Sequence, residues 1–328
     1  MRAILFLLSL AVLATLAWGG YWFVGARGLD RAVSGALASN EQVQAQGHRV
    51  RGFPNRFDLT IDAPQLSLQG FSWRAPFVQV FALSYRPHHL ITVFPDDQQL
   101  EFAGMALSLH SRDARASLVM EPGLALPLER LVLVIEAPEA RLEGQTHRAE
   151  ALRLGTEAMT PEQHAFTAQI ETVFPDAGVM NALDPGAHWP RRFDVLRIEG
   201  EARFERPLDR ASLSQGMPAL SDLVLTGARV IWTEDDVQTD IAAQGRMSTD
   251  AQGRLDGEIT LDIRNWRALM RRAAAADLMP AEHAMLIEMA LGSMVDPDDP
   301  ERLEAPVTLR RGDIMLGPVV LGSLPPLF

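Results

Sequence analysis

The chain has 328 residues, of which 47% are hydrophobic and 22% charged, a balance typical of a folded globular protein. Its formal net charge of -12 argues against nucleic acid as a partner, because a phosphate backbone selects basic surfaces. The absence of cysteine excludes disulfides, thiolate metal sites and a cysteine nucleophile.

The first predicted element is a membrane helix over residues 4–24, where no charged side chain interrupts an apolar run. At about 1.5 Å per residue, the run spans roughly 30 Å, the thickness of a bilayer's hydrocarbon core. Trp18, Tyr21 and Trp22 gather at its C-terminal end, where amphipathic rings favour the head-group level. A cleaved signal peptide, with small residues near Ala17 for a peptidase, is the alternative. Both interpretations export the rest of the chain.

Three parts are expected along the chain. Residues 1–28 form the membrane anchor or signal peptide, residues 29–47 a helical connector, and residues 48–328 a β-rich extracytoplasmic domain. A sub-boundary is expected near residues 176–192, where Asp-Ala-Gly and Asp-Pro-Gly interrupt the strand pattern.

From about His48 onward, apolar residues alternate with polar ones, which is the period of a strand with one buried face. The alternating segments are 57–62, 78–83, 105–110, 131–136, 195–204, 230–233 and 257–263. Short breakers such as Ala63-Pro64 separate them and no helix intervenes, so an antiparallel meander is predicted. Phe-Pro pairs at Phe53, Phe94 and Phe174 predict strand ends or edges, because proline cannot donate to a ladder.

Residues 266–294 form the clearest helical region, with a second helix expected to begin at Pro280. Met285 and Met289 lie on one face of that second helix; a methionine stripe can line a lipid groove but more often packs in a core. The expected fold is mainly β with minor α. An N-terminal transmembrane helix precedes a long curved antiparallel sheet, with two similar β halves as an alternative, and a helical pair lies near the C-terminus.

The sequence shows no constellation of residues that carries catalytic, metal or cofactor chemistry. It lacks the Gly-x-Ser-x-Gly elbow, the Walker A motif and the Rossmann glycines. His88 and His89 are adjacent, and neighbours on a strand point to opposite faces. We therefore expect a non-enzymatic protein with no catalytic, cofactor-binding or metal-binding residues. A hydrolase that uses dispersed carboxylates is the remaining enzyme class.

Several short motifs resemble a known bacterial family. They are Gly20-Tyr21-Trp22-Phe23, the segment 52–58, Asp256-Gly257-Glu258-Ile259 and the segment 311–318. Together they resemble the family called domain of unknown function 2125, over nearly the whole chain. This resemblance implies an uncharacterised membrane-anchored envelope protein. A looser similarity links the chain to AsmA-like envelope proteins, which also place one membrane helix before long β structure and are associated with phospholipid transport. That similarity is an architectural analogy.

These observations support two hypotheses of different classes. The first is an inner-membrane-anchored, periplasm-facing protein that binds lipid or acyl chains on an apolar β surface in envelope maintenance. Its physical motive is the segment 131–135, which is apolar at successive positions, as in a strand that is covered on both faces. The alternative is a scaffold β domain that packs its own core and binds an envelope protein. A lipid carrier should show a continuous apolar surface, and a scaffold one flat patch.

Overall fold

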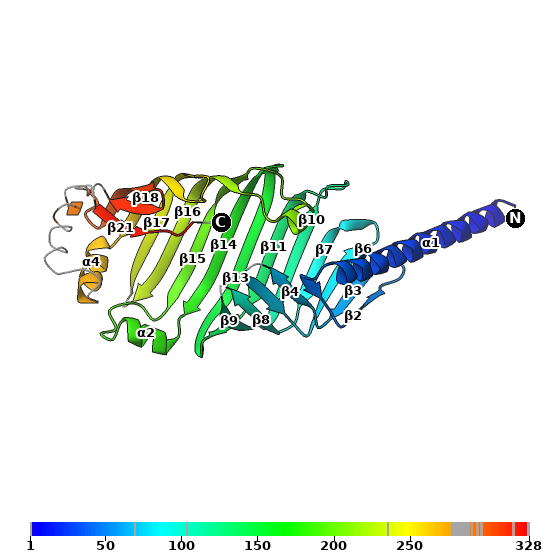
Figure 1. The fold of residues 1–328 in the computed structure, drawn as a ribbon, viewed down its shortest axis with the longest axis horizontal. Coiled ribbons are helices and arrows are strands. Elements are labelled where there is room, and N and C mark those ends of the chain that lie inside the picture. The colour runs from blue at the N-terminus through cyan, green and yellow to red at the C-terminus, as the bar shows by residue number, and fades with distance from the viewer. Residues whose placement is uncertain are drawn as a thin grey trace.

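The computed structural model is an elongated molecule in which one long helix leads into a wide antiparallel sheet (Figure 1). The structure describes residues 2–68, 70–102, 104–234, 236–276, 289, 291–292, 295, 298–316 and 319–326. The prediction of a mainly β fold behind an N-terminal apolar helix is confirmed.

Helix α1 (Arg2–Ser39) begins the described chain. It has no proline, and Arg27 is the first charged residue after Arg2, so one helix runs through the apolar segment and beyond it. The boundary proposed at residue 28 falls inside this helix. The last residues of the expected connector are not helical, because the chain turns after Ser39 and enters a strand.

The remaining chain is dominated by strands. The first group is β1 (Val43–Gln44), β2 (Gly47–Arg51), β3 (Arg56–Asp62), β4 (Gln65–Leu68), β5 (Phe71–Arg74), β6 (Phe77–Leu83), β7 (Arg86–Phe94), β8 (Asp97–Phe102), β9 (Met105–His110), β10 (Asp113–Met120), β11 (Leu128–Glu136) and β12 (Glu139–Leu142). The second group is β13 (Gln145–Thr160), β14 (Gln163–Phe174), β15 (Phe193–Phe204), β16 (Leu220–Glu234), β17 (Val237–Thr249), β18 (Leu255–Arg264), β19 (Arg302–Arg310), β20 (Asp313–Leu316) and β21 (Val319–Ser323).

The pairings between these strands are antiparallel throughout, as predicted. The predicted meander holds from β13 to β21, where each strand pairs with the next along the chain, whereas in the first half non-consecutive strands such as β3 and β6 also pair. Each segment predicted from alternation lies within one strand. The Phe-Pro pairs also lie where proline predicted them: β7 ends at Phe94, β14 ends at Phe174, and Phe53 lies between β2 and β3.

A crease divides the first half of the sheet into two limbs. The main limb contains β2, β3, β6, β7, β10 and β11, and the short limb contains β1, β4, β5, β8, β9 and β12. Both limbs join β13, whose first residues pair with β12 and whose later residues pair with β11.

The chain crosses this crease through short connections such as Ala63-Pro64, Ala75-Pro76 and Ala137-Pro138. Backbone hydrogen bonds continue across it: the Ala63 N–H donates to the Pro76 carbonyl at 2.8 Å, and the Ala137 N–H donates to the Glu150 carbonyl at 2.8 Å. The breaker Ala63-Pro64 is therefore a bend that sends the chain from one limb to the other.

Beyond β13 the sheet continues through β14 to β21. The expected sub-boundary at 176–192 contains the short helix α2 (Ala177–Leu183). However, β14 and β15 on either side of it pair with each other from Gln163 opposite Arg203 to Val173 opposite Phe193. The sheet is therefore continuous across this region.

Two further helices are α3 (Ser212–Gln215) and α4 (Trp266–Ala275), and the described residues 289 and 291–292 are also helical. Helix α4 confirms the first member of the predicted helical pair. The second member, expected from Pro280 to Met294, falls largely on residues outside those that the structure describes.

Candidate functional site: the apolar face of the sheet

The sheet is apolar on one face. Residues that lie opposite each other on paired strands share a face, so the register defines rows of side chains that cross the sheet. One row from β7 to β19 contains Phe94, Ala114, Ile135, Leu152, Ile170, Leu196, Val230, Ile241, Ile263 and Leu303. A second row from β3 to β19 contains Leu59, Val80, Thr92, Ala116, Leu133, Leu154, Ala168, Ile198, Ala228, Ala243, Leu261 and Ala305. We call these two rows the apolar face.

The opposite side is charged and is called the polar face. Its middle row contains Arg115, Val134, Arg153, Gln169, Arg197, Arg229, Ala242, Asp262 and Glu304. Ion pairs connect neighbouring strands on this face. Arg302 donates from Nε and Nη2 to the Asp262 carboxylate at 2.9 and 2.8 Å. The sheet is therefore amphipathic across most of its width.

The expectation that the segment 131–135 is covered on both faces is wrong. Leu131, Leu133 and Ile135 point to the apolar side, whereas Val132 and Val134 lie on the polar face. Val132 is 37% exposed. The consecutive apolar residues of this strand therefore place one group on each face, and only the apolar face is continuous.

The middle of the apolar face is incompletely covered. On β13 to β17 its side chains are half-buried or exposed, with Leu154 at 38%. A depression of about 420 Å³ lies over this region, and Ile170, Leu196, Ile198 and Ile241 are among its lining residues. An apolar surface of this extent on a folded protein marks a binding site more often than an accident of packing.

Helices cover the two ends of the apolar face. At one end, Trp22 and Ala26 of α1 are buried with Phe57 of β3, and the rings of Trp22 and Phe57 stack with centroids 6.0 Å apart. At the other end, Trp266 of α4 is buried against Leu303 of β19. The apolar face thus begins beside the helix that contains the candidate membrane span and ends beneath α4.

The short limb turns its own apolar side toward the main limb. Trp73 on β5 meets Phe94 of the apolar face edge-on, with ring centroids 6.0 Å apart. The Trp73 indole N–H donates to Gln98 Oε1 at 2.9 Å, which satisfies its polar atom. The two apolar sides therefore meet at the crease.

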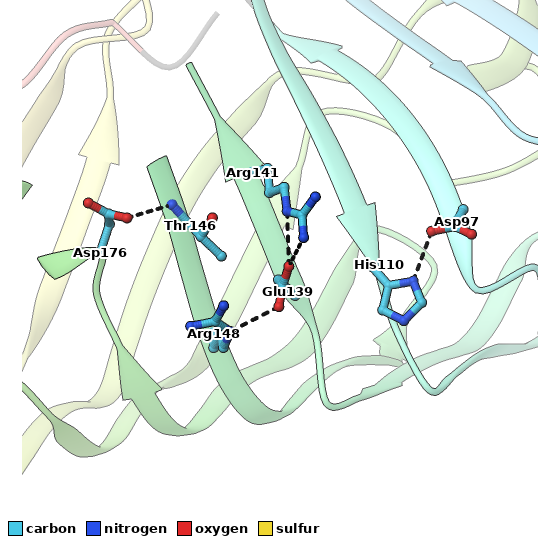
Figure 2. Close-up of polar contacts among 7 residues, drawn as sticks. All are labelled: Asp97, His110, Glu139, Arg141, Thr146, Arg148 and Asp176. Atoms are coloured by element: carbon cyan, nitrogen blue, oxygen red, sulfur yellow. Dashed lines mark hydrogen bonds and ion pairs between the residues drawn. The ribbon is translucent and has the colours of Figure 1, made fainter. Parts of the chain in front are cut away.

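A second candidate site, which we call the polar cleft, has a volume of about 770 Å³ and lies on the other side of the short limb. Figure 2 shows four of its lining residues, Asp97, His110, Glu139 and Arg141. His110 Nδ1 lies 2.8 Å from Asp97 Oδ1. Glu139 accepts hydrogen bonds from Arg141 at 2.7 Å and from Arg148 at 2.9 Å. Cross-strand pairing of β8, β9, β12 and β13 aligns Asp97, His110, Glu139 and Arg148 in one row, and Arg141 lies in the next row on the same face.

Hydrogen bonding shifts the pKa of two groups in the polar cleft. The bond to Asp97 raises the pKa of His110 above its ordinary value. The bonds from Arg148 and Arg141 lower the pKa of Glu139. Beside the cleft, Asp176 accepts from the Thr146 N–H at 2.8 Å, and the backbone N–H groups of Thr146, Val179 and Gly178 lower the Asp176 pKa. Each of these pKa shifts favours the charged form of the side chain. Such shifts are expected where charged groups pair at a protein surface.

The polar cleft also contains Ser108, two residues before His110 on the same face of β9. A nucleophilic serine needs a hydrogen bond to its base, and the base needs an orienting carboxylate. Within the described residues, Ser108 makes no hydrogen bond to His110. The side chains of His110 and Asp97 are 60% and 80% exposed. This geometry does not assemble a nucleophile with its base.

The histidine pair singled out in the sequence does not converge on a common point. His88 and His89 are neighbours on β7, and His89 Nε2 lies 3.0 Å from Ser117 Oγ on β10. Within the described part of the chain, no three His, Asp or Glu side chains gather in a way that could hold a metal ion. The sequence did not predict the residues of the apolar rows or of the polar cleft. Both depend on how distant strands pair, and local periodicity does not reveal the register of that pairing.

A family model described as an uncharacterized protein conserved in bacteria, DUF2125, matches residues 22–325. No curated protein and no solved structure matched the chain. The similarity to AsmA-like envelope proteins stays an architectural analogy. The match begins at Trp22, the residue through which α1 packs on β3, and ends close to the last described strand. This protein belongs to the DUF2125 family of bacterial proteins.

Proposed function

We propose that this protein is an inner-membrane-anchored, periplasm-facing envelope protein whose apolar face binds the acyl chains of lipids. The observation that carries the proposal is the continuity of the apolar face from β3 to β19. A methylene that is fully buried contributes about 0.8 kcal/mol, and each methylene laid on this surface contributes the part of that free energy that corresponds to its covered area. A row of paired strands, about 4.8 Å apart, offers such contacts along the whole length of an acyl chain.

The anchor supports this proposal. Helix α1 is long and apolar enough to cross a membrane. Its apolar residues are exposed over most of the segment 4–24. Exposing these apolar side chains to water would be unfavourable in free energy, whereas their contact with the hydrocarbon of a bilayer is favourable. The structural body that follows the helix then lies on one side of that membrane.

The position of the anchor relative to the sheet also favours a lipid ligand. Leu29 of α1 and Val50 of β2 extend the buried contact around Trp22 and Phe57. A bilayer around α1 would therefore lie at the beginning of the apolar face. The scaffold alternative requires only an apolar patch, whereas a lipid carrier requires that its apolar face begin next to the bilayer.

The experiment uses site-specific photocrosslinking in the full chain, expressed in a bacterial inner membrane. A benzophenone amino acid replaces Ile198, on the apolar face, or Val132, on the polar face. Mass spectrometry of the protein then identifies each adduct. We expect phospholipid or fatty-acid adducts at Ile198 and none at Val132, because only the first position faces the acyl chains.

The photocrosslinking experiment also separates the two hypotheses. Protein adducts without lipid adducts at Ile198 would support the scaffold alternative. Equal lipid adducts at Ile198 and Val132 would show bulk membrane contact and contradict a specific apolar site. Crosslinking is chosen over lipid copurification because lipids that surround α1 would copurify in either case.

A further inference from the structure

We propose that the sheet itself is seated in the membrane through an aromatic edge, which consists of Phe53 and Tyr85 at the turns beside α1. The occupant of this edge is the lipid bilayer that holds α1. This inference rests on the proposed membrane anchoring of α1 and extends it. The body would then be inserted at one edge into the bilayer.

The first argument is the contact between the β2–β3 turn and the apolar half of α1. The ring centroid of Phe53 lies 5.3 Å from that of Trp22 and 5.6 Å from that of Phe23. A side chain added at Gly19 would meet the Phe53 ring at 3.7 Å. The turn therefore follows α1 down into the segment that was predicted to cross the membrane.

The second argument is depth. Gly19 lies five residues before Val24, the last residue of the apolar run. At the helical rise, five residues correspond to roughly 8 Å along the axis. Arg27 is the first charged residue after the run, so the head groups belong near it. Gly19 lies between Trp18 and Tyr21, whose rings favour the head-group level, so Phe53 lies at the boundary between head groups and hydrocarbon and not in the water above it.

The third argument is that the sheet cannot move away from α1 as a separate body. The Tyr21 hydroxyl donates to the Ser84 carbonyl at 2.6 Å, and the Trp22 indole N–H donates to the Arg56 carbonyl at 2.6 Å. Ser84 precedes Tyr85 and, in turn, donates from its hydroxyl to the Pro54 carbonyl at 3.3 Å. Both turns are thus fixed to the helix, which continues into the body without a linker (Figure 1).

The fourth argument is the composition of the exposed surface. Phe53 is 57% and Tyr85 59% exposed, which in water would leave two aromatic rings uncovered. Exposed arginines flank these turns at Arg51, Arg56 and Arg86. Aromatic tips with adjacent cations are the pattern of a membrane interface, where rings enter the acyl boundary and guanidinium groups meet phosphates. This cluster of arginines is a local feature, since the chain as a whole carries a formal net charge of -12.

The test uses fluorescence quenching in the full chain, which contains no native cysteine to compete with an introduced one. An environment-sensitive label is attached to Phe53→Cys or Tyr85→Cys. Leu10→Cys in the apolar run reports whether α1 is in the bilayer. Val237→Cys, at the start of β17, is the matched control, because Val237 is 53% exposed and Phe53 57%. The proteins are reconstituted into mixed phosphatidylcholine and phosphatidylglycerol vesicles with and without doxyl-labelled lipid.

We expect the doxyl lipid to reduce the fluorescence at Phe53→Cys and Tyr85→Cys nearly as much as at Leu10→Cys. Val237→Cys should lose fluorescence only to aqueous iodide. Labels at Phe53 and Tyr85 that respond to iodide alone, while Leu10→Cys is quenched by lipid, would overturn the seated edge and leave the anchor standing. Iodide quenching at Leu10→Cys would overturn both. Neither result depends on whether the apolar face binds lipid, which the crosslinks at Ile198 decide.

Discussion

At the scale of single residues, His164 is an exception on the apolar side of the sheet. It lies on β14 opposite Ala158 and Ala202, is 1% exposed, and meets Phe204 edge-on. Neither ring nitrogen has a hydrogen-bond partner within the described residues. Burial lowers the pKa of His164 below its ordinary value of 6.5. An unpaired polar group of this kind costs free energy that an apolar residue would not.

We expect His164→Leu to raise the free energy of unfolding by about 1 kcal/mol at neutral pH. The difference in free energy of unfolding between His164→Leu and the wild type should increase at acid pH. Since the folded pKa is depressed, the unfolded chain binds the proton first, and wild-type stability falls as pH drops below about 6.5. Thermal unfolding at pH 7.5 and 5.5 measures both effects. His89→Leu is the control, because His89 contacts Ser117 and its loss should not stabilise the fold. An unchanged pH dependence in His164→Leu would contradict this account.

His110 in the polar cleft shows the opposite shift. Its contact with Asp97 raises the pKa of His110, so the contact stabilises the fold fully below pH 6.5 and ever less as pH rises through the raised pKa. We expect Asp97→Asn to return the His110 pKa toward its ordinary value, as followed by the imidazole NMR signals across a titration. Asp113→Asn, which removes a carboxylate paired with Arg115, should leave the His110 titration unchanged.

At the scale of elements, alternation predicted strands well because one face of the sheet is apolar and the other polar. The segment 105–110 was predicted to its last residue as β9. The crease was not predictable in the same way. A breaker such as Ala63-Pro64 has the composition of a turn, and whether the next strand folds back or continues into another limb depends on distant pairing. Positive φ angles at Ala63 and Ala137, 46° and 49°, belong to that bend, and such angles are uncommon for residues other than glycine.

Helix α1 offers two glycines with opposite roles. A methyl group at Gly25 would lie 2.7 Å from the Phe57 ring, whereas one at Gly28 would meet nothing within 4 Å. Alanine favours a helix over glycine by roughly 1 kcal/mol. We therefore expect Gly28→Ala to stabilise the full chain and Gly25→Ala to destabilise it by loosening the contact of α1 with β3. Denaturation in detergent followed by near-ultraviolet circular dichroism, which senses the Trp22 environment, measures this difference. Equal effects of the two substitutions would show that the close approach at Gly25 is unimportant.

At the scale of the whole molecule, the kind of surface was predictable from the sequence, and its residues were not. Periodicity indicated strands with one buried face but could not say which strands share it. A run such as 131–135 carries apolar residues at both parities, and only the register with β10 and β13 assigns Leu133 to the apolar face and Val132 to the polar one. The polar cleft depends on the same long-range register. Family resemblance implied a membrane-anchored envelope protein but added no site residue.

Leu154 and Val132 allow a direct test of what the apolar face contributes to the molecule. They lie on the paired strands β13 and β11, their exposed fractions are 38% and 37%, and they point to opposite faces. A carboxylate at either position therefore costs a similar amount in the ligand-free protein. A ligand that binds only the folded state stabilises it by about 2.7 kcal/mol at a hundred times its Kd. We expect a short-chain phospholipid below its micellar concentration to raise the Tm of wild type and of Val132→Asp, and not that of Leu154→Asp. Equal Tm increases in the wild type and in both variants would mean that the lipid stabilises the protein through surfaces other than the apolar face. Equal loss in both variants would contradict a site confined to the apolar face, because a charge on the polar face cannot reach a chain that lies on the far side of the sheet.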